Sequence, residues 1–241
     1  MSTPAEPQAS PSWPVLSMNE RRVLGVLVEK AKTTPEVYPL TVNALVTGCN
    51  QKSNREPLMH LTDGEVEDTL TSCQKKGLTV KITGGRAERW RHTLYDTWHV
   101  RNVDLAILAE LLLRGAQTEG ELRGRASRME PIADLDALRA VLRPLAERRL
   151  VVFLGEEGRR GTLITHGFQS PQDVDRLRAT HSAATVSDDA PPTASAPARS
   201  ERVDQIAELR AEMAQLQATV ADLAERVKAL EERLGAKPPT S

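Results

Sequence analysis

The stretch TDGEVEDTLTSCQKKGLTVKITGGRAERW, residues 62–90, predicts a helix and a β-hairpin in immediate succession. Thr62 followed by Glu65 is a capping box, a signature of a helix start, and apolar residues then recur at helical spacing. Two lysines before Gly77 are typical of a helix end, because cations favour the last turn and glycine accepts the conformation beyond it. LTVKI then predicts a strand, and the glycine-containing ITGGRAERW predicts the turn into a second strand.

The same order of elements occurs twice along the chain. VLGVLVEKA, from Val23, matches ILAELLLRG, from Ile107, and the apolar positions of 66–82 match those of 138–154. In each copy an amphipathic helix and a short second helix precede the third helix and the hairpin. Three helices followed by a hairpin form the winged-helix arrangement, a relative of the helix-turn-helix. We therefore expect a mainly α protein with small β-hairpins (α+β) and two tandem winged-helix domains.

Capping residues predict where the other helices begin. Ser17 with Glu20 opens the first helix, and Thr118 with Glu121 opens the short second helix of the second copy. Pro144 falls inside the third helix of that copy, where it lacks a backbone donor. It therefore predicts a kink or a broken turn.

The composition changes sharply around residue 169, where small residues, prolines and charged residues replace the regularly spaced apolar residues. Such a stretch buries too little apolar surface to offset the entropy of ordering it, and it predicts disorder. The expected organisation in chain order is a disordered N-terminus at 1–14, winged-helix domain 1 at 15–100, winged-helix domain 2 at 101–168, a disordered linker at 169–200 and a coiled-coil helix at 201–235.

The C-terminal apolar residues alternate at steps of three and four, as in a coiled coil. Branched residues dominate one heptad position and leucine fills the other, a division that favours two parallel strands. A parallel homodimer is therefore expected, and the alternatives are a helix for another partner or an amphipathic helix that docks on the globular part. The expected dimerisation residues are Ile206, Leu209, Met213, Leu216, Val220, Leu223, Val227, Leu230 and Leu234.

The balance of charged residues and the short apolar runs argue against a nucleic-acid or membrane coat and against a membrane-spanning or secreted protein. Lys and Arg number 32 against 33 Asp and Glu, a balance that argues against a generally basic nucleic-acid or membrane coat. The first residues lack the features of a secretory signal, and the longest apolar run, 105–113, contains Glu110 and is too short for a membrane span. Cys49 and Cys73 form no metal or disulfide pattern. We expect a cytoplasmic protein with two reduced, buried thiols and no membrane partner.

No residue pattern supports catalysis. The five histidines are scattered, without a pair at helical spacing or a cysteine partner for a metal. Nucleophile-elbow, P-loop and dinucleotide-binding motifs are lacking, and Gly84-Gly85 is typical of a hairpin turn. The sequence therefore predicts a protein that is not an enzyme and has no cofactor.

The polar segment CNQKSNREP, residues 49–57, is an enlarged connection between the second and third helices of the first copy. Such side chains can donate to phosphates and base edges, and basic hairpin tips commonly follow the DNA backbone. The candidate nucleic-acid-binding residues are Asn50, Gln51, Lys52, Asn54, Arg55, Arg86, Arg89, Arg91, Arg159 and Arg160. The alternative is a surface loop that caps its own turns, with Arg55 paired to Glu56 or a neighbour, and a solvated hairpin face.

The start of the third helix opposes the usual docking on DNA. In helix-turn-helix proteins this start meets base edges, but here it holds Asp63, Glu65, Glu67 and Asp68. If double-stranded DNA is the partner, the enlarged connection and the hairpins should contact it. We expect a DNA-binding protein or transcription regulator, and the alternative is a protein-binding adaptor or scaffold that does not bind DNA.

One longer resemblance is specific. TTPEVYPLTVNALVTGCNQKSNREPLMHLTDGEVEDTL, with LLLRGAQTEGELRGRASRM later, resembles the YceH-like family of uncharacterised bacterial proteins over roughly residues 18–168. The resemblance implies a tandem winged-helix fold in a bacterial protein and implies no biochemical role. Glu119 stands where the family often has proline, at the start of a helix.

Overall fold

The computed structural model describes residues 13–85, 87–159 and 161–185. They form a mainly helical α+β fold with two small antiparallel sheets. The first half contains α1 (Met18–Thr33), the 3-10 helix η1 (Pro35–Val37), α2 (Val42–Cys49), α3 (Asp63–Lys75), β1 (Thr79–Ile82), β2 (Arg89–His92) and α4 (Leu94–Trp98). The second half contains α5 (Asn102–Arg114), β3 (Gln117–Thr118), α6 (Glu119–Ala126), α7 (Leu135–Glu147), β4 (Val151–Phe153), β5 (Leu163–His166) and α8 (Pro171–Thr185).

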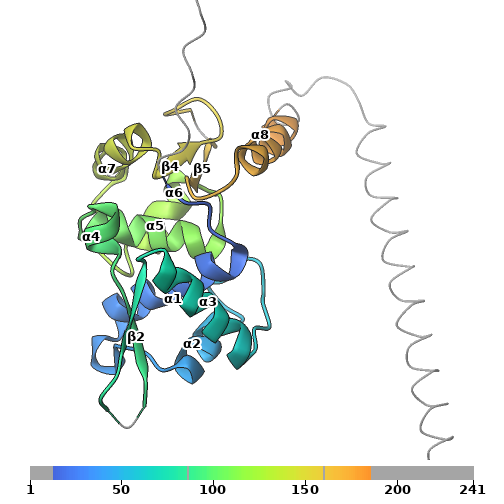
Figure 1. Cartoon of the computed structure of the whole chain (residues 1–241). Coiled ribbons are helices and arrows are strands. Elements are labelled where there is room, and N and C mark those ends of the chain that lie inside the picture. Colours follow the sequence, from blue (N-terminus) through green and yellow to red (C-terminus); the bar gives the residue numbers. More distant parts are fainter. Residues whose placement is uncertain (1–12, 86, 160, 186–241) are drawn as a thin grey trace, which may run out of the picture. The chain divides into compact units, whose positions relative to one another are not determined.

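The repeated order of elements appears in both halves. Helices α1, α2 and α3 precede the β1–β2 hairpin, and α5, α6 and α7 precede the β4–β5 hairpin (Figure 1). In the first sheet Thr79 pairs with His92 and Ile82 with Arg89. In the second sheet, the short strand β3 adds to β5 on the side opposite β4, so the order is β3-β5-β4. Each hairpin follows its third helix directly, as the sequence predicts.

The predicted helix starts are confirmed by their hydrogen bonds. Capping boxes open α1, α3 and α6, and the carboxylate of the third helical residue accepts from the backbone N–H of the cap in each. The distance from the Thr62 N–H to Glu65 Oε2, for example, is 2.8 Å. Local chemistry alone sets these starts, because both partners lie within one turn.

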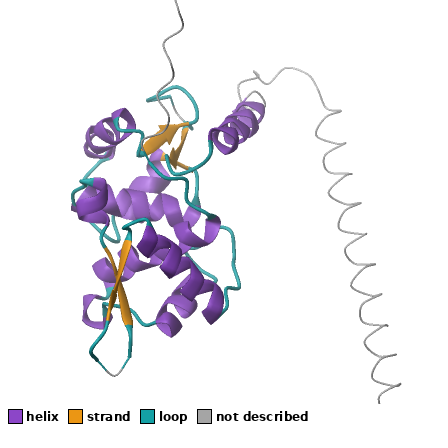
Figure 2. Cartoon of the chain, in the orientation of Figure 1, coloured by secondary structure: helices purple, strands orange, loops and turns teal. Residues whose placement is uncertain are grey.

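Helices α1 and α5 pack against each other at the centre of the described part (Figure 2). Gly25 on α1 allows the close approach, since an added Cβ there would lie 2.7 Å from Leu113 Cγ on α5. Beyond α5, the rings of Trp98 and Phe168 stack with centroids 4.4 Å apart. The aliphatic core therefore extends from one half of the described chain into the other.

The disorder expected at 169–200 is wrong for its first part, where α8 forms. Ser170 caps this helix by accepting from the N–H of Asp173 at 3.2 Å, and Pro171 occupies the first helical position. Val174 packs inward with 9% of its surface exposed. The polar composition hid a capped helix in which Val174 is buried and Leu177 is half-buried. Residues 186–200 lie outside the described part.

Two smaller expectations also change. Trp13 belongs to the stretch expected to be disordered, yet its indole N–H donates to the Arg148 carbonyl at 2.8 Å. Helix α7 runs unbroken through Pro144. The carbonyl that Pro144 leaves without a donor belongs to Ala140, and both residues are exposed, so water can satisfy it. The expected coiled coil at 201–235 and residues 1–12 lie outside the described part.

No helix in the described part combines the length and the apolar character that crossing a membrane requires.

Candidate nucleic-acid interface

The connection between α2 and α3 is closed at its base by Asn50. Its amide Nδ2 donates to the Leu61 carbonyl and its Oδ1 accepts from the Leu61 N–H, both at 2.8 Å. One side chain therefore joins the first residue after α2 to the last residues before α3. The Asn50 side chain therefore has a structural role within the protein.

Arg55 points inward from this connection, where 4% of its surface is exposed. Its guanidinium faces Glu29 of α1, with Arg55 Nη2 2.5 Å from Glu29 Oε2. It also donates to the Gly48 carbonyl at 2.9 Å and to Gln51 Oε1 at 3.0 Å. The sequence left open whether Arg55 contacts DNA or pairs with a neighbour, and the geometry favours the neighbour. That neighbour is Glu29 and not Glu56.

The connection is also fastened to the second half of the described chain. The Glu56 N–H donates to the Leu113 carbonyl of α5 at 2.9 Å, and Asn54 Oδ1 accepts from the Arg114 guanidinium. Arg22 of α1 donates to the Pro57 carbonyl at 2.5 Å. A loop held by both central helices keeps a fixed shape, so its exposed residues are presented in a defined geometry.

The second half uses a related buried ion pair. Glu110 of α5 is fully buried and lies 3.0 Å from Arg114 Nε and 3.3 Å from Arg128, which follows α6. Burial raises the pKa of Glu110, and the arginines oppose that rise. In each half, therefore, a carboxylate on the first helix binds an arginine from the connection after the second helix.

The predicted contact residues thus divide into two groups. Asn50, Gln51, Asn54 and Arg55 make contacts inside the protein, as described above. Lys52, Arg89, Arg91 and Arg159 are exposed, whereas Arg86 and Arg160 lie outside the described residues. Arg89 also donates to the Pro39 carbonyl at 2.7 Å, which ties it to the segment between η1 and α2.

The β1–β2 hairpin presents its basic residues around a buried ring. Trp90 is 4% exposed and anchors β2 to the helices, while its neighbours Arg89 and Arg91 face solvent. Lys81 on β1 lies over the Trp90 ring at 5.6 Å from its centroid. The alternation of strand residues therefore places Arg89 and Arg91 on the outer face of the hairpin, opposite Trp90 and its cross-strand partner Lys81.

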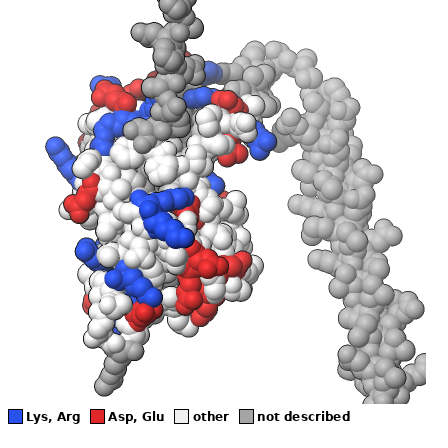
Figure 3. All heavy atoms as spheres, viewed as in Figure 1, with Lys and Arg blue, Asp and Glu red and all other residues white. Residues whose placement is uncertain are grey.

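The carboxylates at the start of α3 are exposed, as the sequence suggested. Asp63, Glu65, Glu67 and Asp68 all face solvent. In the part of the face in Figure 3 that the structure describes, acidic and basic side chains form separate groups instead of one continuous basic band. Phosphates would therefore be repelled at this helix start and attracted at the hairpin.

Three arginine and glutamate contacts were missed in the sequence. Glu29 and Arg22 are buried on α1, and Arg114 is the half-buried last residue of α5. All three side chains contact the connection. The available signal in the sequence was a charged residue within a dense apolar run. Burying such a charge is costly unless it is paired, so a partner could be expected. Its partner lies far along the chain and could not be chosen from the sequence.

The thiols and metal-binding groups show no reactive arrangement among the described residues. Cys49 and Cys73 are buried and free, as expected, and burial raises the pKa of each to about 12. Both are therefore thiols and not thiolates at neutral pH. Within the described ranges, no group of three His, Cys, Asp or Glu side chains is placed to hold a metal ion.

Fold and interface together define a mainly helical protein that repeats a three-helix and hairpin unit, with a buried ion pair inside each unit and hydrogen bonds from the first connection to α5 between them. The chain belongs to the family described as "Protein of unknown function, DUF480", whose sequence profile matches residues 16–160.

Similar proteins occur in several bacteria. A UPF0502 protein of Rhodopirellula baltica is 42% identical over 212 residues, which cover 85% of this chain and 89% of the relative. A UPF0502 protein of Geobacter metallireducens is 54% identical over 135 residues, 56% of this chain and 62% of the relative. One from Geobacter sulfurreducens is 48% identical over 159 residues, 64% of this chain and 73% of the relative.

Proposed function

We propose that the protein binds double-stranded DNA without catalysing a reaction, as a dimer of two tandem winged-helix domains per chain. The observation that supports this most is the β1–β2 hairpin, which holds Arg89 and Arg91 on its exposed face beside the anchored Trp90. Guanidinium groups on a projecting strand pair suit phosphate oxygens along a DNA backbone. Contact with phosphates carries no sequence information, so the proposed binding is of broad specificity.

The fixed connection adds one cation to this surface. Lys52 is exposed on a loop whose neighbours Asn50 and Arg55 are hydrogen-bonded inward. The loop therefore needs little ordering when it meets a ligand, which lowers the entropic cost of binding. In the proposed dimer, two copies of each hairpin would act together, and weak contacts would combine if both reach the same duplex.

A double Lys52→Ala/Arg91→Ala variant tests the proposed surface. Each residue is exposed, so the fold should survive, while each lost phosphate contact should lower the salt slope of DNA binding by about 1. Binding to a fluorescent duplex is measured by anisotropy from low to physiological salt. The matched control is Arg101→Ala/Arg178→Ala. It also removes two exposed positive charges, and both lie outside the β1–β2 hairpin and the connection. Equal slopes for the two double variants would contradict the assignment.

A second function, a protein-binding adaptor, is favoured by the exposed carboxylates on α3. Four acidic residues at the start of α3 interact favourably with the dipole of that helix and suit a basic partner better than a phosphate. This function predicts a protein partner that remains bound to the full-length chain after nuclease treatment. It also predicts that Asp63→Lys/Asp68→Lys releases that partner, whereas the same change should strengthen DNA binding if DNA is the ligand.

A further inference from the structure

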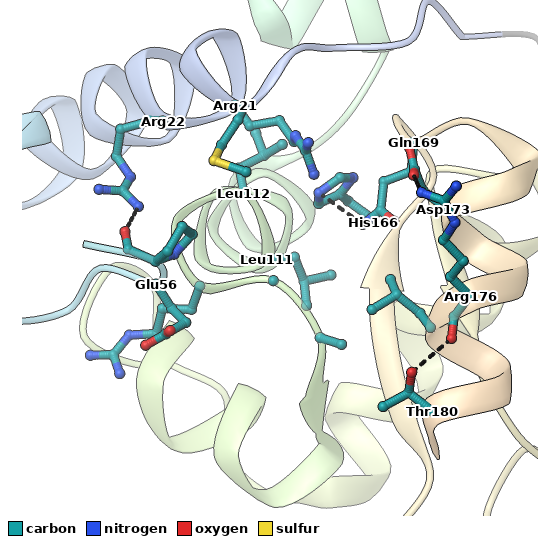
Figure 4. A pocket seen from close by; sticks show the side chains of 16 residues that line it. Arg21, Arg22, Glu56, Leu111, Leu112, His166, Gln169, Asp173, Arg176 and Thr180 are labelled. Atoms are coloured by element: carbon teal, nitrogen blue, oxygen red, sulfur yellow. Dashed lines mark hydrogen bonds and ion pairs between the residues drawn. The ribbon is translucent and has the colours of Figure 1, made fainter. Parts of the chain in front are cut away.

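A cavity of about 470 Å³ lies between α1, the connection before α3, the end of α5 and α8 (Figure 4). Its volume is within the range of small-molecule sites in proteins. Its walls come from the first half, the second half and α8, and all the residues that form them belong to the described part. No described residue of the β1–β2 hairpin lines the cavity.

The cavity has an excess of positive charge. Four arginines line it, Arg21, Arg22, Arg114 and Arg176, against two carboxylates, Glu56 and Asp173, a formal excess of two positive charges. Arg114 is paired with Glu110, and Arg176 lies 3.7 Å from Asp173. The two remaining arginines, Arg21 and Arg22, belong to α1.

Arg22 is buried without an anionic partner. It is 2% exposed and donates to the carbonyls of Cys49 and Pro57, and it makes no ion pair with any described residue. Its Nε lacks a hydrogen-bond acceptor. Burial lowers the pKa of Arg22, a sign that the charge is poorly solvated where it lies. A nearby anion would offset that cost.

Arg21 extends in the other direction, toward His166 of β5 (Figure 4). Its Nε donates to the Ser17 carbonyl at 3.3 Å, and its two terminal nitrogens make no hydrogen bond with a described residue. Burial keeps His166 neutral by lowering its pKa to about 3, so the positive charge at this end of the cavity comes from Arg21 and not from the imidazole. Arg21 is therefore half-buried at the cavity wall, where the Asp173 carboxylate also acts on its charge, and the four N–H groups of its terminal nitrogens remain as donors.

The remaining walls are largely apolar. Leu111 and Leu112 of α5 and Leu177 of α8 line the cavity, and Ala116 follows the end of α5. Leu111 is fully buried and Leu112 is 5% exposed. A hydrocarbon group placed against these side chains would leave water on binding, which is favourable.

We propose that this cavity binds a small amphipathic anion, with a carboxylate or phosphate head at Arg21 and an apolar body against Leu111, Leu112 and Leu177. The planar guanidinium of arginine suits both head groups because each offers two oxygens for paired hydrogen bonds. The bound anion would contact α1, α5 and α8 together and so would stabilise the position of α8.

The test uses the full-length protein and four probes: hexanoate, phenyl phosphate, hexanol and inorganic phosphate. Binding is measured by isothermal titration calorimetry and by the thermal unfolding midpoint. Hexanoate, phenyl phosphate or both should bind and raise the midpoint, and whichever binds more tightly identifies the head group. Hexanol and inorganic phosphate, which each lack one of the two features, should bind at least 10-fold more weakly.

Two variants locate the site. Arg21→Gln should weaken binding of the anion by roughly 10-fold or more, since charge-assisted hydrogen bonds are lost. Thr180→Trp places a large side chain at the cavity wall from an exposed position on α8 and should block binding by a different route. Arg178→Gln, on the same helix but outside the cavity lining, should bind as the wild type does.

The proposal is overturned if neither anion binds the wild type, or if hexanol or inorganic phosphate binds as tightly as the anions do. Binding that survives both Arg21→Gln and Thr180→Trp would also overturn it. Circular dichroism verifies that each variant is folded before its affinity is compared. If Arg21→Gln does not fold, the comparison of Thr180→Trp with Arg178→Gln decides the outcome.

Discussion

Arg55 holds a positive charge inside the protein, where its guanidinium and the Glu29 carboxylate are 2.5 Å apart. Taking both charges out of water is costly, and their attraction together with three further hydrogen bonds offsets that cost. Removal of one partner would leave the other charged and buried. Arg55 therefore fixes the connection between α2 and α3, and through it the position of Lys52.

Arg55→Ala should lower the free energy of unfolding by about 3–5 kcal/mol, because Glu29 is left buried and unpaired. Urea unfolding followed by circular dichroism measures this loss. Lys52→Ala, three residues away and exposed, is the control and should change stability by no more than about 0.5 kcal/mol. Similar small losses for both variants would show that the ion pair does not hold the connection.

Two buried histidines make stability depend on pH. Burial lowers the pKa of His92 to about 4, with Lys32 and Arg91 adding to the effect, and lowers the pKa of His166 to about 3. In the unfolded chain both return to about 6.5. Between pH 6.5 and 4, the unfolded state therefore binds more protons, and stability falls as the pH falls by up to about 1.4 kcal/mol per unit for each histidine.

The measurement is urea unfolding at several pH values from 7 to 4.5. His92→Phe should be less sensitive to pH over this window than the wild type, because one of the two groups no longer titrates. His99→Phe, a change at an exposed histidine, should retain the wild-type dependence. A pH profile of His92→Phe that superimposes on the wild type would contradict this account.

At the scale of single residues, the sequence showed which side chains are polar but not whether each points into the protein or to solvent. The dense polar run 49–57 predicted either a DNA contact or a self-capped loop, and both descriptions used the same side chains. Asn50 and Arg55 are turned inward by partners 11 and 26 residues away. Contacts over such separations depend on the packing of whole helices, so no local pattern contains them.

At the scale of elements, the predicted features were those set by neighbours in sequence. Capping boxes at Ser17, Thr62 and Thr118 placed three helix starts, since both partners of each box lie within one turn. Strand β3 was missed because its two residues form a strand only by pairing with β5, more than 40 residues later. Helix α8 was missed because its composition resembles a linker, although Ser170-Pro171 is a typical helix start.

The close packing of α1 on α5 gives a prediction from two glycines. Gly25→Ala should destabilise the protein by about 1–3 kcal/mol, because the new Cβ would lie 2.7 Å from Leu113 Cγ in a filled core. Gly64→Ala is the matched control in another helix, where nothing lies within 4 Å of the added Cβ. It should be neutral or stabilising by up to about 1 kcal/mol.

Urea unfolding of the two glycine variants beside the wild type provides the comparison. A destabilisation of Gly64→Ala that equals that of Gly25→Ala would mean that helix propensity, and not packing between α1 and α5, sets the effect.

At the scale of the whole molecule, the two halves are joined by packing and by charge. Helices α1 and α5 share an apolar contact, and the first connection is bonded to Leu113 and Arg114 of the second half. The repeat therefore forms one connected structure over the described residues. Trp90 of the first hairpin and Leu113 of α5 share one apolar cluster, whereas Val151 and Ile164 of the second hairpin belong to the other. The repeat itself was visible in the sequence, whereas this joining of its copies was not.

The proposed dimer gives a prediction for residues outside the described part. Leu216→Asp/Leu223→Asp places charges at two positions of the apolar heptad seam and should convert a dimer into a monomer. Size-exclusion chromatography with light scattering measures the mass, and Gln217→Asp, beside the seam, is the control. A monomeric wild type, or a double variant that remains dimeric, would contradict the coiled coil.

The most direct measurement is the affinity of the full-length protein for a mixed set of duplex DNA fragments as a function of salt. The proposed function predicts binding at low salt that weakens linearly in log Kd against log salt, and the slope divided by ~0.9 gives the number of phosphate contacts. Absence of binding at low salt, or binding that does not change with salt, would contradict DNA contact through the hairpin arginines and leave a protein partner as the ligand of this surface.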